Sequence, residues 1–168
     1  SVQGNSTWEL EIMTQKTRQF RTTGKSYPAE RLDPLRLIAH LPLHPYQVLA
    51  DFHCGSGHFT IPLAKHLFDG KVYASDSDSD ALDELKQNLI KTRLTNVVVG
   101  QEEAIQPETL DGVLMAFALY RLRNKKSFLR NTLGLLKKGS WIAVLEWYQR
   151  ETPDGPPVSA RIGETALV

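Results

Sequence analysis

The sequence has little of three things: cysteine, long apolar runs and net charge. Its single cysteine, Cys54, cannot form an intrachain disulfide, and this favours a reducing compartment, so we expect a cytoplasmic protein. No apolar run is long enough to span a bilayer and no secretory leader is recognisable, so we expect no membrane association. The formal net charge of +1 gives no electrostatic case for nucleic acid or an anionic lipid surface as partner.

What is present suits one globular domain. The chain has 168 residues, of which 41% are apolar and 23% charged, enough for a sizeable core but not for two domains. Residues 1–30 are polar and weakly patterned, and we expect an N-terminal arm there. The folded domain is expected over 31–148, and a Pro-rich loop and tail over 149–168.

Short apolar runs alternate with segments of helical periodicity. Strands are expected at 47–52, 71–75, 96–99, 110–117 and 140–147, and helices at 34–41, 58–68, 79–92 and 127–137. This alternation predicts an α/β fold with a doubly wound, parallel, Rossmann-like sheet. Ligands of such sheets bind beyond the carboxyl ends of the strands, so the residues that follow each strand are the candidates for a site.

The first strand runs into a glycine-rich turn. Asp51 ends the apolar run, Gly55 and Gly57 follow, and a helical pattern begins after them. Glycines let a ligand approach the backbone, and the free N–H groups of a helix start face it. This order predicts a nucleotide-type cofactor at the turn.

Polar residues also follow the next strands. Asp76 lies about twenty residues beyond the glycines, where a carboxylate can accept both ribose hydroxyls in dinucleotide folds. Gln101 and Glu102 follow the third strand, within reach of an adenine amino group, and Glu146 follows the fifth. Any one of these alone is better explained as a helix cap or a solvated charge, but their recurrence at successive strand ends favours a ligand.

These segments together resemble the class I S-adenosylmethionine-dependent methyltransferases, closest to the quinone-biosynthesis-like, type 11 branch. The resemblance runs from about Leu32 to Trp147, and rests on the turn, on Val72–Asp76, on Leu110–Leu119, on Leu135–Trp141 and on Leu145–Trp147. It implies strand order 3-2-1-4-5 and S-adenosyl-L-methionine as cofactor. The cofactor-binding residues that it implies are Asp51, His53, Gly55, Gly57, Asp76, Ser77, Gln101, Glu102 and Phe117. The family usually has glycine where His53 stands and aspartate where Gln101 stands.

The implied activity is methyl transfer, by in-line displacement, to an unidentified small-molecule acceptor. A general base would help if the acceptor carries a proton; the candidates are His58, Tyr120, Glu146 and, from the arm, Tyr27. No metal is expected, because the histidines and cysteine of the turn lack a fourth ligand.

Three other functions compete with this one. The first alternative is a methyltransferase-like module without catalysis that serves as a scaffold. The second is an RNA methyltransferase, which is disfavoured because the chain has neither a second, nucleophilic cysteine nor an Asn/Asp-Pro-Pro-aromatic motif. A nicotinamide-dependent oxidoreductase would need glycine where Thr60 stands.

The end of the chain departs from the resembling family. That family continues after its fifth strand with a helix and an antiparallel strand pair, whereas about twenty residues follow Tyr148 here, opening with a Pro-rich segment. We therefore expect no final hairpin, one short helix at most within 158–168, and a fifth strand whose edge is exposed or covered by a second copy or another partner.

Overall fold

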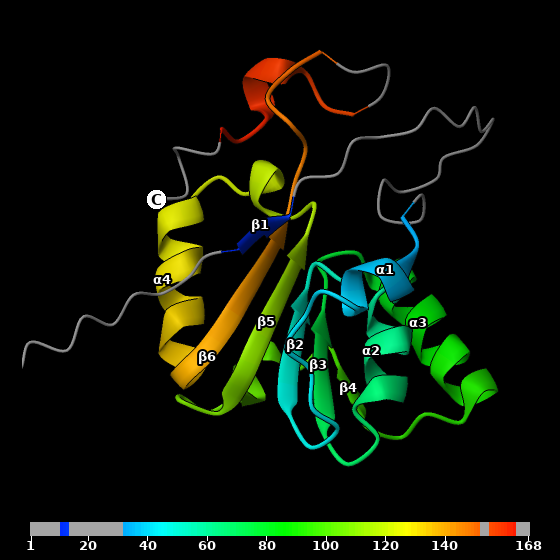
Figure 1. Ribbon diagram of the computed structural model, residues 1–168. Helices are drawn as coiled ribbons and strands as arrows, with labels where there is room; N and C mark the ends of the chain where they lie inside the picture. Colours follow the sequence, from blue (N-terminus) through cyan, green and yellow to red (C-terminus); the bar gives the residue numbers. More distant parts are fainter. Residues whose placement is uncertain (1–10, 14–31, 152–154, 164–168) are drawn as a thin grey trace, which may run out of the picture.

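The computed structural model describes residues 11–13, 32–151 and 155–163. They form one parallel sheet of six strands in the order β1-β6-β5-β2-β3-β4 (Figure 1). The strands are β1 (Glu11–Met13), β2 (Val48–Phe52), β3 (Lys71–Ser75), β4 (Val97–Val99), β5 (Leu110–Ala116) and β6 (Leu136–Leu145). The helices are α1 (Pro34–Ile38), α2 (Thr60–His66), α3 (Ser79–Thr92) and α4 (Lys125–Leu135), with 3₁₀ turns η2 (Glu102–Ala104), η3 (Leu119–Arg121) and η4 (Val158–Ala160).

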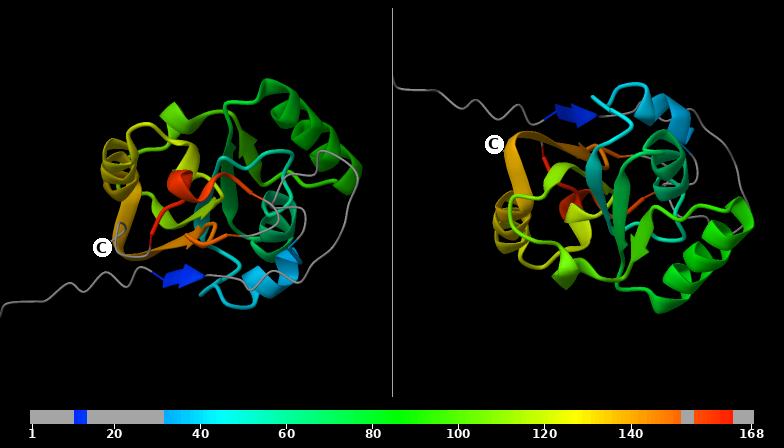
Figure 2. Two further views of the ribbon diagram at one scale, coloured as in Figure 1. Left: turned by 90° about the horizontal axis from the view of Figure 1, so that it is seen from above. Right: turned by 90° about the horizontal axis from the view of Figure 1, so that it is seen from below.

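Helices cover both faces of the sheet, as the nearly continuous apolar strands require. Seen from above and from below, α1, α2 and α3 lie on one face of the sheet and α4 on the other (Figure 2). Alternate residues of β2 divide between the two cores: Leu49 packs with the α1–α2 side, and Ala50 with the α4 side. The predicted doubly wound α/β fold is confirmed, and so is the order 3-2-1-4-5 of its five main strands.

The expectation about the edge of the fifth strand was wrong in one respect. The chain itself supplies a sixth strand: β1 pairs in parallel with the carboxyl half of β6, from Glu11 opposite Ala143 to Met13 opposite Leu145. Apolar and acidic residues alternate over residues 8–12, which is typical of a strand, but the partner strand lies more than a hundred residues away, and local patterning does not reveal such a pairing. Along the paired stretch, that edge is covered within the chain.

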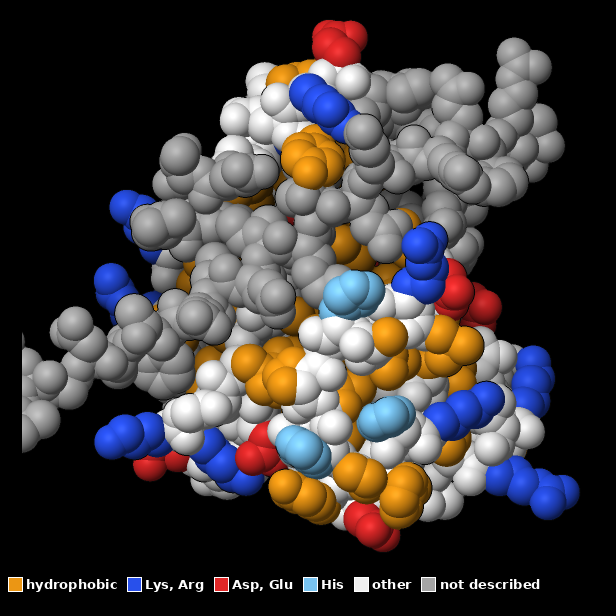
Figure 3. Space-filling model, viewed as in Figure 1, with side chains coloured by type: hydrophobic (Ala, Val, Ile, Leu, Met, Phe, Trp, Pro, Cys, Tyr) orange, Lys and Arg blue, Asp and Glu red, His pale blue; other side chains and the backbone are white. Residues whose placement is uncertain are grey.

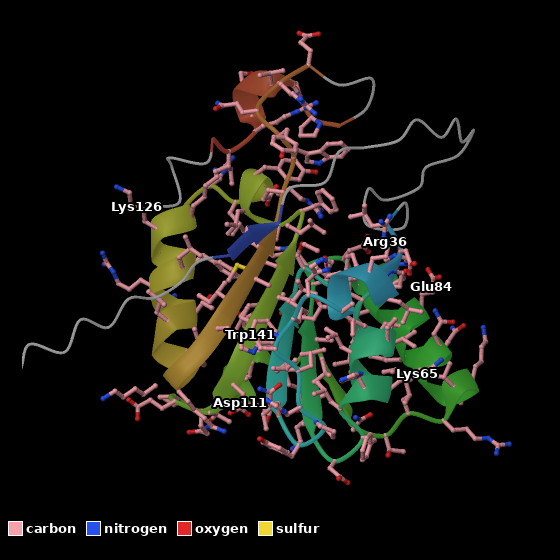
Figure 4. All side chains as sticks on the ribbon, in the orientation of Figure 1. Arg36, Lys65, Glu84, Asp111, Lys126 and Trp141 are labelled. Atoms are coloured by element: carbon pink, nitrogen blue, oxygen red, sulfur yellow. The ribbon has the colours of Figure 1, made fainter. Side chains whose placement is uncertain are left out.

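The junction between α4 and β6 also differs from the sequence expectation, which continued the helix to Lys137. Leu136 already pairs with Leu110, and the next pair joins Trp141 to Gly112, so the residues between them bulge from the ladder. Lys137 donates to Asp111 Oδ1 at 2.8 Å, which ties this bulge to β5. Asp111 and Trp141 lie on the lower part of the sheet in Figure 4, away from the carboxyl ends.

Beyond β6, the described part of the tail forms only the short turn η4. One buried arginine holds it: Arg161 donates to the carbonyl oxygens of Pro156, Tyr148 and Arg150 at 2.8, 3.1 and 2.6 Å. The segment 155–163 lies above the carboxyl ends of β5 and β6 (Figures 1 and 2). Among the described residues, no helix is long and apolar enough to cross a membrane.

Candidate cofactor and active site

The turn between β2 and α2 has an unusual backbone. Three of its residues have positive φ: His53 at 60°, Gly55 at 56° and Gly57 at 93°. Glycine adopts this region freely, whereas histidine is strained there. The family's usual glycine at the position of His53 is thus explained by backbone geometry, and here a histidine holds the same conformation.

The two glycines of the turn serve different purposes. A Cβ atom on Gly57 would lie 2.4 Å from Leu85 Cδ1, so this glycine allows the turn to pack against α3. A Cβ atom on Gly55 would meet no atom within 4 Å. Gly55 therefore borders open space, which a ligand can enter to approach the backbone closely.

Asp76 joins the turn to the start of α3. Its Oδ2 accepts from the Gly55 N–H at 2.8 Å, and its Oδ1 accepts from the Asp78 N–H at 3.0 Å. Each carboxylate oxygen can accept a second hydrogen bond, so the side chain is fixed in place with acceptor capacity to spare. This arrangement suits a residue that receives two vicinal hydroxyls.

Asp51 lies beneath the turn and is almost completely buried, with 1% of its surface exposed. Burial raises the pKa of Asp51 to about 7; a 2.7 Å hydrogen bond from the Thr60 hydroxyl opposes this shift, and the negative charge of Asp76 adds to it. An ionised carboxylate is destabilising there unless a cation or further donors reach it, and a cofactor amino group would supply both.

The remaining predicted cofactor residues lie in two places, near the end of β3 and at the end of β5. Glu102 is brought to the end of β3, where it accepts from the Ser75 hydroxyl at 3.0 Å, whereas Gln101 and Ser77 are exposed on the turns beside it. Phe117 lies at the end of β5, with φ of 55° and its ring 5.4 Å from that of Trp147.

Arg161 was not identified from the sequence, and Trp147 was noted only within the resembling segment Leu145–Trp147, without a role. The guanidinium of Arg161 lies 5.4 Å from the Trp147 ring centre, so contacts run from the tail through Trp147 to Phe117. Arg161 is only 5% exposed. An isolated arginine in a polar tail carries no sequence signal of burial, and only the fold shows it.

Glu146, a candidate base, instead holds the loop after β5. Its Oε1 accepts from the N–H groups of Leu119 and Tyr120 at 2.6 and 3.3 Å, while Oε2 is buried without a hydrogen-bond partner in the described part of the chain. Burial raises the pKa of Glu146 to about 7, although these backbone donors oppose the shift. The carboxyl group thus fixes η3 and retains one oxygen that could exchange a proton.

The other candidate bases have less support. His58 Nε2 lies 2.7 Å from the Leu32 carbonyl oxygen, which can only accept, so this nitrogen carries the hydrogen and connects the turn to the segment before α1. No hydrogen bond of the Tyr120 hydroxyl occurs among the described residues, and Tyr27 lies outside them. Burial raises the pKa of the Cys54 thiol far above its usual range, which keeps it an unreactive thiol.

Unsatisfied buried atoms gather at this end of the sheet. In residues 32–151 and 155–163, four buried side-chain atoms lack a hydrogen-bond partner: His53 Nδ1, Glu146 Oε2, Trp147 Nε1 and Trp141 Nε1. The first three belong to residues that directly follow β2 and β6. Buried polar groups are normally paired, so this concentration indicates a site that a ligand or water completes.

Comparison with known proteins agrees with this geometry. Residues 50–142, more than half of the chain, match the methyltransferase domain family, and the chain belongs to it. The predicted class is confirmed: an S-adenosyl-L-methionine-dependent methyltransferase of EC class 2.1.1. A comparison with curated proteins finds no match.

Solved structures share the fold. A SAM-dependent methyltransferase from Aquifex aeolicus is 26% identical over 84% of this chain and 79% of its own, with a TM-score of 0.75. A Sulfolobus solfataricus structure assigned to the type 11 methyltransferases is 24% identical over 71% of this chain and 68% of its own, with a TM-score of 0.63. Coclaurine N-methyltransferase, bound to N-methylheliamine and SAH, is 18% identical over 65% of this chain and 33% of its own, with a TM-score of 0.59.

Proposed function

We propose that this chain transfers the methyl group of S-adenosylmethionine to a small-molecule acceptor by in-line displacement, in the cytoplasm. The observation that carries the proposal is the hydrogen bond from the Gly55 N–H to the Asp76 carboxylate. It joins the open turn to a fixed carboxylate that can accept further hydrogen bonds. A sulfonium methyl group needs no covalent intermediate, so the chain's task is to hold cofactor and acceptor in line.

Each predicted residue takes a position in this proposal. Asp76 and Ser77 would hold the ribose, and Gln101 and Glu102 the adenine. The methionine end would lie over Asp51, His53, Gly55 and Gly57, with Phe117 beside it. The amino group of the cofactor would favour ionised Asp51, since a nearby cation lowers the pKa of a carboxyl group.

The scaffold alternative differs from this proposal in cofactor affinity. Isothermal titration calorimetry with S-adenosylmethionine should give a dissociation constant on the order of micromolar for the wild-type chain, and Asp76→Ala should weaken it at least about tenfold, because two charge-assisted hydrogen bonds are lost. Asp83→Ala is the matched control, since Asp83 is exposed on α3 and, among the described residues, forms an ion pair with Lys86 alone. No binding by the wild-type chain, or equal losses in the two variants, would refute the proposal.

A further inference from the structure

Acidic and basic residues are unevenly distributed along the chain. Acidic residues follow β3 and β4, including Asp76 and Glu102. By contrast, no Asp or Glu occurs from Gly112 to Leu145, a stretch that contains seven basic residues: Arg121, Arg123, Lys125, Lys126, Arg130, Lys137 and Lys138. The overall net charge of +1 conceals this separation.

Local helix stability does not account for these charges. Lys125 and Lys126 open α4, where the helix dipole is positive and cations are unfavourable. Lys and Arg side chains stand out along the α4 side of the molecule, and Lys126 points outward from that helix (Figures 3 and 4). Lys125 donates to the Leu122 carbonyl oxygen and Lys137 to Asp111, but Arg121 has no ion pair with any residue in the described ranges.

Arg121 differs from the others because it lies at the site. It ends η3, whose N–H groups at Leu119 and Tyr120 are fixed by Glu146. The helix that follows it, α4, places the Phe128 ring 5.8 Å from the His53 ring, between ring centres, so the loop of Arg121 and the cofactor turn lie at the same end of the sheet. Burial lowers the pKa of His53, and the positive charge of Arg121 adds to that shift, against the charges of Asp76 and Glu102. Arg121 is thus exposed on an anchored loop at the same end of the sheet as the cofactor turn.

We propose that Arg121 binds a carboxylate or phosphate group of the methyl acceptor. This inference rests on the proposed methyltransferase function and adds the substrate class. The planar guanidinium offers two parallel donors to a carboxylate or phosphate, which orients as well as binds it. Glu146 is a weak competitor, because its Oε1 already accepts two backbone N–H groups and its burial disfavours the ionised form.

Nuclear magnetic resonance of the His53 imidazole ring, with S-adenosylhomocysteine bound, tests the inference. Inorganic phosphate and benzoate serve as probes, titrated at constant ionic strength with chloride as the balancing anion. Both anions should give saturable chemical-shift changes in the His53 ring. Arg121→Gln should raise the dissociation constant of each anion by roughly tenfold. Arg130→Gln is the matched control, because Arg130 lies one helical turn beyond Lys126 on the exposed face of α4. It should change these dissociation constants by less than about twofold.

Three results would overturn the inference. Absence of saturable shifts would show that no anion binds near His53, and equal weakening in both variants would show diffuse surface attraction. If Arg121→Gln weakens the binding of S-adenosylhomocysteine itself, measured by calorimetry, the arginine holds the cofactor's own carboxylate rather than the acceptor's. Failure of the wild-type chain to bind S-adenosylhomocysteine refutes the proposed function before the anion titration begins, so the two failures are distinguishable.

Discussion

Replacing Asp51 with asparagine should remove a pH-dependent loss of stability while impairing the cofactor site. The folded chain keeps the proton of Asp51 up to a pKa of about 7, whereas the ordinary value is 3.8. Between these values the folded state binds more protons than the unfolded state, so raising the pH lowers stability throughout this window. The wild-type chain should therefore lose about 2 kcal/mol through Asp51 between about pH 5 and pH 7, and little more above that.

The asparagine variant removes this pH-dependent loss. Its amide oxygen can still accept from the Thr60 hydroxyl, but its NH₂ group lacks an obvious partner, a penalty of about 1–3 kcal/mol that does not vary with pH. Urea unfolding of both proteins without cofactor, at several pH values from about 5 to 8, measures the effect. The free energy of unfolding of Asp51→Asn minus that of the wild type should rise by about 2 kcal/mol from about pH 5 to pH 7. A constant difference would refute the buried, proton-holding role of Asp51.

Three further changes test other contacts. Gly57→Ala should destabilise the chain by about 2 kcal/mol or more in urea unfolding, because positive φ and Leu85 both oppose a Cβ atom, whereas Gly55→Ala should lose only about 1–2 kcal/mol from its backbone. Glu146→Gln should keep the loop after β5 and most of the stability, while Glu146→Ala should lose about 1–3 kcal/mol through unpaired N–H groups; equal losses would contradict the anchoring role. Arg161→Lys should shift tryptophan fluorescence to longer wavelength, since the compact lysine ammonium cannot span the three carbonyl oxygens that the wider guanidinium joins; an unchanged spectrum would contradict this contact.

Sequence patterning predicted the fold best where local signals were strong. The bounds of β3 and α3 coincide with the predicted 71–75 and 79–92, because apolar periodicity and the Asp78 cap define them locally. The pairing of β1 with β6 and the bulge before Trp141 were missed, since both depend on contacts between distant parts of the chain.

The site was predicted in outline but not in its connections. Spacing along the chain indicated Asp51 and Asp76. Only the fold shows that Asp76 accepts a hydrogen bond from the Gly55 N–H and that Asp51 accepts one from the Thr60 hydroxyl. Glu146 was a candidate base because it follows a strand. In the structure, its carboxylate instead accepts a hydrogen bond from the backbone of the loop after β5. A residue type at a strand end thus indicates a site, but its hydrogen bonds decide its role.

Backbone amide shifts on addition of S-adenosylhomocysteine test the central claim most directly. The account predicts the largest shifts at Gly55, Gly57, Asp76 and Glu102, because ligand contact changes the environment of those N–H groups, and negligible shifts at Arg130 on the outer face of α4. Shifts confined to other parts of the chain, or none at saturating ligand, would contradict the assignment of the β2–α2 turn as the cofactor site.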